Sequence, residues 1–126
     1  MAPVVNNLIP YAHVADVPRS VKFYELLGFR VISRHEHPRG KLLWAHLEAN
    51  HGRIMLAQAD GPVDAGVQAI LFYLYADDVA ALRKHLLENS VEVSEIGRPF
   101  YMPNGEIRIT DPDGYCLLIG QLRPSS

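Results

Sequence analysis

The sequence predicts an α+β fold built from two tandem βαβββ modules. One reason is an internal repeat: at an offset of 62 residues, Asp16 aligns with Asp78 and Tyr11 aligns with Tyr73. A second reason is the pattern inside each half, where an apolar, strand-like segment runs into an aspartate and then into a helical stripe of apolar residues. The offset is close to half of the 126 residues, so the chain is predicted to consist of two tandem copies of one structural unit.

The first module is expected at about residues 6–60. A strand over Asn7–Ala15 is rich in apolar and aromatic residues and ends at Asp16, a residue type that caps helices. Pro18 suits the first helical turn, and Gly28 suits the end of the helix. The helix presents one apolar stripe, formed by Val17, Val21, Phe23, Tyr24 and Leu27. Three more strands are predicted, over Phe29–His35, Leu42–Ala49 and Arg53–Gln58.

The second module is expected at about residues 67–122. Its first strand covers Val67–Ala76, Asp78 begins the helix, and Asn89-Ser90 ends it. The three strands that follow are predicted at Val91–Ile96, Glu106–Thr110 and Tyr115–Gln121. The linker over residues 61–66 is too short to separate independent domains, so the two modules are expected to share a core in a single domain of residues 1–126.

Composition and charge argue against several classes of protein. With 48% hydrophobic residues and a net charge of −2, the chain is neither disordered nor a typical nucleic-acid binder. Its longest apolar runs, such as Ala69–Tyr75, are too short to span a bilayer, and its first residues lack the features of a signal peptide. Cys116 is the only cysteine, so no intramolecular disulfide can form. These features favour a cytoplasmic protein without nucleic-acid or membrane partners.

Three segments carry a resemblance to a known family: Val14–Tyr24, Leu26–Val31 and Asp111–Tyr115. Their order and spacing resemble the glyoxalase/bleomycin resistance protein/extradiol dioxygenase superfamily, also called the vicinal oxygen chelate superfamily. The resemblance implies that the two modules form a curled mixed sheet around a cup-shaped cavity, with the helices on the convex side. It also implies a homodimer.

The resemblance places metal ligands, which are His, Glu or Gln in metal-binding members, at four positions of this chain. Those positions hold Ile9, Met55, Leu71 and Leu118. Divalent metals need nitrogen, oxygen or thiolate donors, which these side chains do not provide. We therefore expect no metal and no cofactor, and an apolar cavity floor like that of the metal-free, bleomycin-resistance-like members.

Alternation along the strands predicts which side chains line the cup. The candidates are Tyr11, His13, Trp44, His46, Glu48, Tyr73, Tyr75 and Arg108, with Phe100 and Tyr101 in a loop that could cover the mouth. Glu48 could accept a hydrogen bond from a cationic ligand, and Arg108 could hold an anionic group. The alternative is ordinary sheet packing for the aromatic residues, with Arg108 paired to Glu106 or Asp111.

Three functions remain open on the sequence. The first is a metal-free binding protein that sequesters or senses a hydrophobic or aromatic small molecule, such as an antibiotic. The second is an enzyme of the same fold, a lyase, isomerase or oxidoreductase with an absent or non-standard metal site, in which His13, His46 or Glu48 acts as acid or base. The third is an interaction module without a ligand, because one fold hosts many functions.

Overall fold

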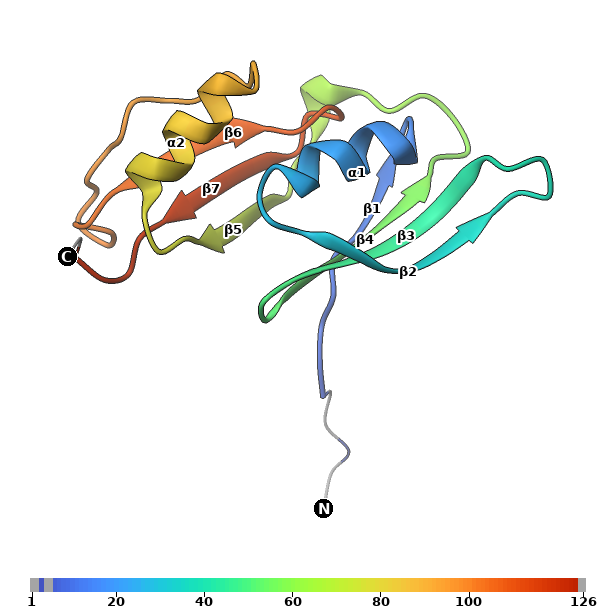
Figure 1. Ribbon diagram of the computed structural model, residues 1–126, viewed down its shortest axis with the longest axis horizontal. Helices are drawn as coiled ribbons and strands as arrows, with labels where there is room; N and C mark the ends of the chain where they lie inside the picture. The colour runs from blue at the N-terminus through green and yellow to red at the C-terminus, as the bar shows by residue number, and fades with distance from the viewer. Residues whose placement is uncertain (1–2, 4–5, 125–126) are drawn as a thin grey trace. The chain divides into compact units, whose positions relative to one another are not determined.

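The computed structural model describes Pro3 and residues 6–124 and divides the chain into two compact units, Met1–Val63 and Asp64–Ser126 (Figure 1). We call them unit 1 and unit 2 and describe each by itself. Each unit contains one α-helix and one mixed sheet, which confirms the α+β class. No helix in the described part of the chain is long and apolar enough to cross a membrane.

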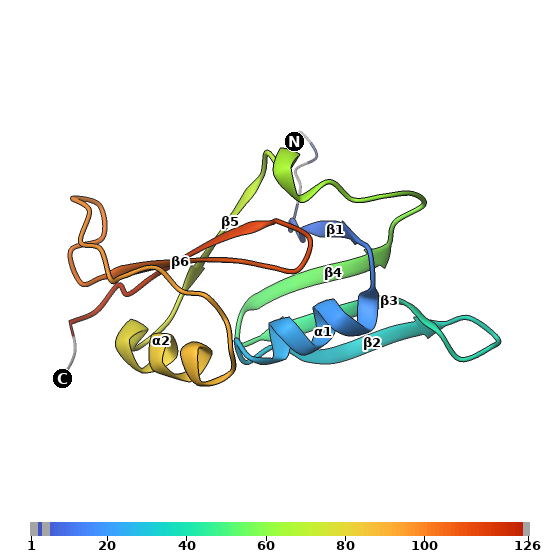
Figure 2. The ribbon, with the colours of Figure 1, turned by 90° about the horizontal axis from the view of Figure 1, so that it is seen from above.

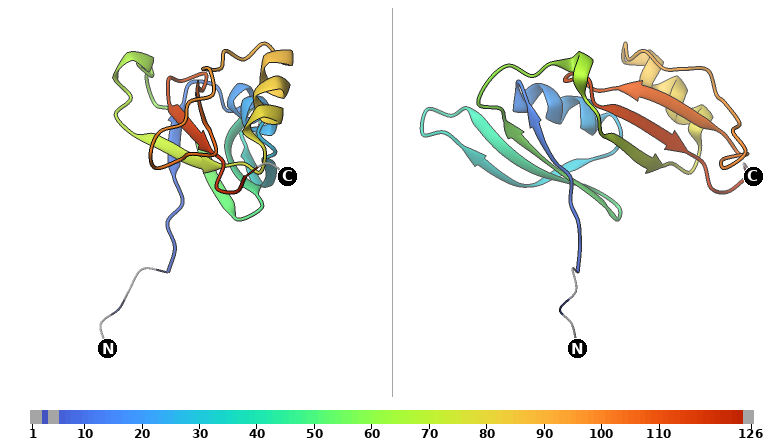
Figure 3. Two further views of the ribbon diagram at one scale, coloured as in Figure 1. Left: turned by 90° about the vertical axis from the view of Figure 1, so that its left-hand side faces the viewer. Right: turned by 180° about the vertical axis from the view of Figure 1, so that it is seen from behind.

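Unit 1 contains a four-stranded sheet and one helix (Figure 3). Its elements are β1 (Tyr11–Val14), α1 (Val17–Glu25), β2 (Arg30–Glu36), β3 (Leu42–Ala49) and β4 (Gly52–Gln58). The strand order is β1-β4-β3-β2. Strands β1 and β4 are parallel, and the other neighbouring pairs are antiparallel.

Unit 2 repeats this plan with one strand fewer. Its elements are a short 3₁₀ helix (Ala65–Val67), β5 (Leu71–Tyr75), α2 (Val79–Glu88), β6 (Glu106–Thr110) and β7 (Cys116–Gly120). The strand order is β5-β7-β6, with β5 and β7 parallel and β6 and β7 antiparallel.

The two helices begin in the same way, as the sequence predicts. The carboxylate of Asp16 accepts a hydrogen bond from the backbone N–H of Arg19 at 3.3 Å. The carboxylate of Asp78 accepts one from the N–H of Ala81 at 3.0 Å. Each aspartate therefore satisfies a donor in the first helical turn that has no partner within the helix.

The two helices also end in the same way. Gly28 and Ser90, which are 62 residues apart, both have a left-handed backbone, with φ of 92° and 64°. The residue after each of them donates its N–H back into the helix, Phe29 to the Tyr24 carbonyl and Val91 to the Leu86 carbonyl. The repeat therefore extends to the hydrogen bonds that close the helices.

Each helix packs on one face of its own sheet (Figure 2). The apolar core of each unit lies between that helix and that sheet. In unit 1, α1 packs against β3 and β4; the buried side chains include Ala12, Val14, Val17, Val21, Tyr24, Ala45, Leu47, Ile54 and Leu56. In unit 2, α2 packs against β6; the buried side chains include Val79, Leu86, Ile107, Ile109, Leu117 and Ile119.

The strand predicted at Val91–Ile96 is wrong, because this segment forms no regular ladder with β6. Only an isolated bridge between Gly97 and Glu106 and a backbone hydrogen bond from Ser94 to the Arg108 carbonyl join the two. The N–H of Arg108 donates instead to the Ser94 hydroxyl, at 2.9 Å. A side chain thus takes the bond that a strand carbonyl would take, and the ladder is interrupted.

The first strand of each module is also shorter than predicted. Strand β1 begins at Tyr11 rather than at Asn7, and β5 begins at Leu71 rather than at Val67. Residues 7–10 have no regular structure, and Val67 ends the 3₁₀ helix. Apolar residues precede each strand, so the residue pattern predicted longer strands. The strand ladders do not include these residues, and they therefore lie outside the sheet.

Candidate functional site

Each sheet has one face that does not meet its own helix, and we call this the open face of the unit. Side chains alternate between the faces of a strand. On β1, Ala12 and Val14 are buried toward the helix side, whereas Tyr11 and His13 are exposed on the open face. Residues in register on neighbouring strands share a face, so the strand pairing assigns the rest of each open face.

The open face of unit 1 carries aromatic and imidazole side chains around a methionine. Tyr11 is in register with Met55, which is in register with His46. The next row contains His13, Ala57 and Trp44. The rings of Tyr11 and His13 meet edge to face at 5.7 Å, and those of Trp44 and His46 at 6.2 Å.

Glu48 also lies on this open face, between two arginines. Its carboxylate forms ion pairs with Arg30 at 3.0 Å and with Arg53 at 2.7 Å, and its side chain is 18% exposed. Both arginines are in register with it on the neighbouring strands. A cationic ligand would therefore have to displace an existing partner, which makes Glu48 a weaker acceptor than the sequence suggested.

His46 has a buried polar atom without a partner. Its Nε2 atom is shielded from solvent and forms no hydrogen bond. A buried, unsatisfied ring nitrogen costs free energy, which a hydrogen-bonding ligand could recover.

The open face of unit 2 holds a compact cluster of two tyrosines and one glutamate. The hydroxyl of Tyr73 donates to Oε2 of Glu106 at 2.6 Å, and the hydroxyl of Tyr101 donates to Oε1 at 3.1 Å. We call these three residues the tyrosine–glutamate cluster. The ring of Tyr75 packs beside that of Tyr73, with centroids 5.3 Å apart.

Gly120 makes room for this cluster. A methyl group at this position would lie 2.7 Å from the Tyr73 hydroxyl and 2.8 Å from Cε of Met102. Tyr73 reaches Glu106 across β7 because residue 120 has no side chain. An isolated glycine inside a strand is a known sign of such a close approach, and this signal in the sequence could have identified Gly120.

The cluster holds both tyrosines in their neutral form. Burial of the hydroxyl and then the bond to Glu106 raise the pKa of Tyr73 well above its usual value, although its ring stays 38% exposed. The hydrogen bond to Glu106 also raises the pKa of Tyr101. A phenol that donates to a carboxylate resists the loss of its proton, because the product would place two negative charges side by side.

Arg108 shares this open face but takes no part in the cluster. It is in register with Leu118, which is in register with Tyr73. Its guanidinium forms no hydrogen bond or ion pair with any residue that the structure describes. The alternative interpretation, in which Arg108 pairs with Glu106 or Asp111, is therefore wrong, and Glu106 binds the tyrosines instead.

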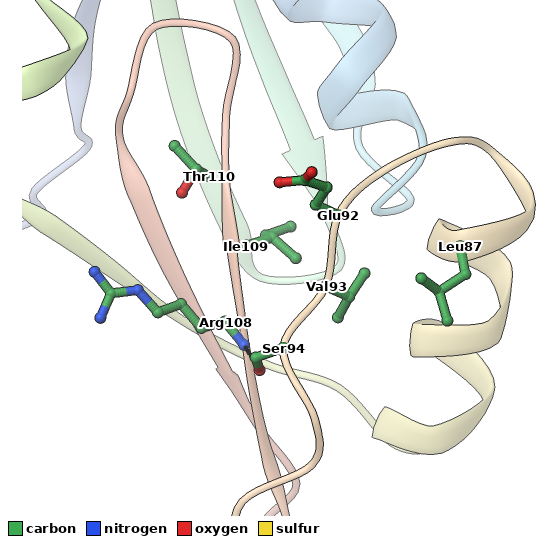
Figure 4. Close-up of a pocket in the computed structure, with 7 residues that line it drawn as sticks. All are labelled: Leu87, Glu92, Val93, Ser94, Arg108, Ile109 and Thr110. Atoms are coloured by element: carbon green, nitrogen blue, oxygen red, sulfur yellow. Dashed lines mark hydrogen bonds between the residues drawn. The ribbon is translucent and has the colours of Figure 1, made fainter.

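The side chain of Arg108 extends away from α2 (Figure 4). On the helix side of β6, a groove of about 710 Å³ follows the irregular segment that replaces the predicted strand. It is lined by Leu87, Glu92, Val93, Ser94, Arg108, Ile109 and Thr110. Arg108 is among the residues that line this groove, and its guanidinium extends away from Leu87 (Figure 4).

The loop that was expected to cover the cavity begins with a turn in which the Met102 N–H donates to the Pro99 carbonyl at 2.9 Å. Phe100 is 96% exposed, whereas Tyr101 is tied to Glu106. The two neighbouring aromatic residues therefore differ in role: Tyr101 belongs to the cluster, and a covering role for Phe100 stays a prediction.

The four positions at which the resemblance places metal ligands do not fit a metal. Met55 and Leu118 occupy equivalent central places on the two open faces, Leu71 lies beside Cys116, and Ile9 precedes β1. Hydrocarbon and thioether groups are poor donors to hard divalent cations. Across the described residues, no group of three His, Cys, Asp or Glu side chains is placed to hold a metal ion.

Comparison with known proteins places this geometry in a family context. The sequence model of the Glyoxalase/Bleomycin resistance protein/Dioxygenase superfamily matches residues 10–119. No sequence among curated proteins gives a significant match.

Solved structures that resemble the chain include binding proteins and an enzyme. A bleomycin-binding protein in complex with bleomycin has a TM-score of 0.75 at 18% identity, over 94% of this chain and 100% of that chain. TnmS3, an antibiotic binding protein from Streptomyces sp. CB03234, has a TM-score of 0.71 at 22% identity, over 99% and 100%. A glyoxalase I mutant from Zea mays has a TM-score of 0.75 at 24% identity, over 91% of this chain and 44% of that chain. At these identities the likeness shows the fold.

Proposed function

The chain belongs to the Glyoxalase/Bleomycin resistance protein/Dioxygenase superfamily, and from that premise we propose that it is a metal-free binding protein for a hydrophobic or aromatic small molecule. Its role is to sequester or to sense that compound, which could be an antibiotic. The open face of each unit offers a surface for binding.

One observation carries the proposal: large aromatic side chains stand exposed on the open face of each unit. Tyr11 is 57% exposed and Tyr75 is 62% exposed, beside the less exposed Tyr73. Exposed apolar surface on a soluble protein commonly marks a site of interaction. Aromatic faces stack on planar ligands, and tyrosine hydroxyls orient them.

The side chains at the expected metal-ligand positions and the similar solved structures also support a metal-free binding protein. Met55 and Leu118 offer apolar contact where metal-dependent relatives are expected to have ligands. Two of the similar structures are described as binding bleomycin or an antibiotic. An antibiotic ligand for this chain is part of the proposal.

The proposal includes a homodimer in the cytoplasm, in which units 1 and 2 act as modules of one domain. The dimer follows from the family resemblance, and the single Cys116 favours a reducing compartment. Light scattering during size-exclusion chromatography should give about twice the mass of the 14.1 kDa chain. A monomer at micromolar concentration would remove the dimer from the proposal and leave the binding role to be judged by ligand screening.

A thermal-shift screen against aromatic metabolites and peptide antibiotics, including bleomycin, tests the binding role. At least one compound should raise the melting temperature, because a ligand that binds only the folded state stabilises it. Tyr11→Ala and Tyr75→Ala should reduce that shift. Leu87→Ala, which truncates an exposed apolar residue on α2, is the control and should leave the shift unchanged. If no compound gives a shift, the proposed function is wrong.

Elemental analysis of the purified protein tests the metal-free part. We expect less than stoichiometric zinc, nickel, iron, manganese or copper, and no stabilisation by these ions when they are added. Stoichiometric metal that is lost on substitution of open-face residues would contradict this part of the proposal.

A metal-independent enzyme is the second candidate, and the unpartnered Nε2 of His46 favours it. An imidazole that lacks a partner can accept a proton from a bound substrate. Glyoxalase and ring-cleavage assays, with and without added metal, should then detect activity that His46→Gln removes. The control is His85→Gln, which alters an exposed histidine on α2. Absence of turnover in every assay would leave the binding role as the better account.

A further inference from the structure

The open face of unit 2 carries two opposite charges that differ in their surroundings. Glu106 and Arg108 lie two residues apart on β6, so both project from the same face. Each carboxylate oxygen of Glu106 accepts a hydroxyl hydrogen bond from the tyrosine–glutamate cluster, at 2.6 and 3.1 Å. The negative charge is therefore covered by donors that belong to the protein.

Arg108 is in the opposite situation. Its guanidinium has no acceptor among the described residues, and it is the one cationic side chain that β5, β6 and β7 place on this open face. A guanidinium presents five N–H donors in a planar fork that matches the oxygens of a carboxylate, sulfonate or phosphate. The uncommitted charge on this surface is thus positive.

On the side of Arg108 that faces β7 and β5, the neighbouring side chains are apolar and aromatic. The side chain of Leu118 lies in register between Arg108 and Tyr73, and the ring of Tyr75 lies beside that of Tyr73. A planar ligand lying against Leu118 and the tyrosine rings could place an acidic group at the edge near Arg108. A cationic ligand in that pose would meet the positive charge of Arg108 and an already bonded Glu106.

We propose that unit 2 selects aromatic ligands that carry an anionic group, with Arg108 binding the anion and with Tyr73, Tyr75 and Leu118 binding the ring. This inference rests on the proposed function, because it names the chemical class of the ligand for the same surface. Arg108 is the specificity determinant, and Glu106 serves to hold Tyr73 and Tyr101 in place.

Three probes that share one ring system test the selection by charge: 2-naphthoate, 2-naphthamide and 2-naphthylmethylammonium. Their affinities for the full chain are measured by isothermal titration calorimetry at low and at physiological salt. Naphthoate should bind about tenfold more tightly than the neutral amide, the factor that corresponds to one charge-assisted contact of about 1.4 kcal/mol. The cationic probe should bind most weakly.

Substitutions then assign the preference to its residue. Arg108→Gln should remove the tenfold preference for naphthoate and leave the amide affinity within about twofold of wild type. Arg34→Gln is the matched control, because Arg34 is also an exposed strand arginine but pairs with Glu36 on β2. That variant should keep the preference. The melting temperature of each variant verifies that it is folded.

Glu106→Gln separates the two charges without removing Arg108. Because Glu106 also holds Tyr73 in place, the readout is the ratio of the naphthoate affinity to the amide affinity, which should be at least the wild-type tenfold when the nearby negative charge is lost. A ratio near one in Glu106→Gln, or a preference for naphthoate that persists in Arg108→Gln, would overturn the inference.

The outcomes distinguish this inference from the proposed function. If no probe binds and no compound of the wider screen binds, both are wrong. If the amide binds as tightly as naphthoate, or if the cationic probe binds most tightly, the aromatic-binding role stands and the selection of anions is wrong.

Discussion

Units 1 and 2 share a backbone plan but have different open faces. Strand register makes the row Tyr11, Met55, His46 in unit 1 equivalent to the row Tyr73, Leu118, Arg108 in unit 2. In the next row, His13, Ala57 and Trp44 correspond to Tyr75, Gly120 and Glu106. Both units have a tyrosine and an apolar central residue in the first of these rows. The third residue differs, because the imidazole of His46 in unit 1 is replaced by the guanidinium of Arg108 in unit 2.

The features that the two units share are those that each helix needs in order to form. Helix caps at Asp16 and Asp78 and left-handed helix ends at Gly28 and Ser90 are repeated because each helix needs them to begin and to stop. The open face of each unit does not contact the helix of that unit, so its side chains are not constrained by the core. We therefore expect the largest loss of stability from a substitution at a turn, and changes in binding from substitutions on the open faces.

The largest effect should come from the turn before β7 in unit 2. A methyl group at Gly114 would lie 2.5 Å from both Cα and the carbonyl oxygen of Ala65, and Gly114 has a φ of 87°. Gly114→Ala should lower the free energy of unfolding by about 3 kcal/mol, the sum of left-handed strain and overpacking. Urea denaturation followed by circular dichroism measures this.

Gly28 provides the comparison in unit 1. It has a φ of 92°, but a methyl group there would meet no atom within 4 Å. Gly28→Ala should cost only the backbone strain, about 1–2 kcal/mol. Equal losses for the two variants would show that the close approach to Ala65 does not matter.

A second variant breaks the tyrosine–glutamate cluster. Gly120→Ala should displace Tyr73 from Glu106 and lower the free energy of unfolding by about 1–3 kcal/mol through overpacking. The equivalent residue of unit 1 is already alanine, Ala57, so Ala57→Gly should not disturb a cluster there. Denaturation curves give the loss, and the absorbance of ionised tyrosine gives the state of Tyr73. An unchanged titration in Gly120→Ala would contradict the role of this glycine.

Alkaline pH should act on unit 2 through the same cluster. The pKa of Tyr73 is raised by burial and by Glu106, so folding favours the neutral phenol. The resulting stability is complete below the ordinary tyrosine pKa of about 10 and is lost as pH rises from there toward the raised value. Wild type should therefore lose stability above about pH 10 more steeply than Tyr73→Phe does. Parallel curves of stability against pH for the two proteins would be inconsistent with this coupling.

A smaller effect is expected from the ion pairs of unit 1. Glu48→Gln should cost about 0.5–1 kcal/mol at low salt and less at high salt, because the two arginine partners are largely exposed. Thr110 holds the equivalent place in unit 2 and forms no ion pair, so Thr110→Ala should stay within about 0.5 kcal/mol of wild type. Thermal melts at two salt concentrations test this. A loss in Glu48→Gln that does not depend on salt would mean that packing, and not charge, is responsible.

The smallest effect should be a gain in stability. Ser90 ends α2 with a φ of 64°, where unit 1 has a glycine. Ser90→Gly should raise the free energy of unfolding by about 0.5–1 kcal/mol by relieving left-handed strain. Asn50→Gly is the control, because Asn50 has a φ of 51° but asparagine tolerates this conformation better than serine does. Urea denaturation should give a larger gain for Ser90→Gly, and a loss would contradict the proposed strain.

The residue pattern alone predicts the features that depend on neighbours along the chain. The aspartate caps, the helix ends and strand β3 at Leu42–Ala49 are where the residue pattern predicts them. Alternation also indicated that Tyr11 and His13 share a face opposite Ala12 and Val14. Such features are local, because caps, turns and side-chain alternation span only a few residues.

The residue pattern does not predict which side chains meet across strands. Glu106 binds Tyr73, 33 residues away, and leaves Arg108 without a partner; Ser94 interrupts the strand predicted beside β6. Nothing in the local pattern of Glu106 distinguishes a tyrosine partner from an arginine partner. The choice depends on strand register and on the space above Gly120, and both are fixed only when distant segments pack together.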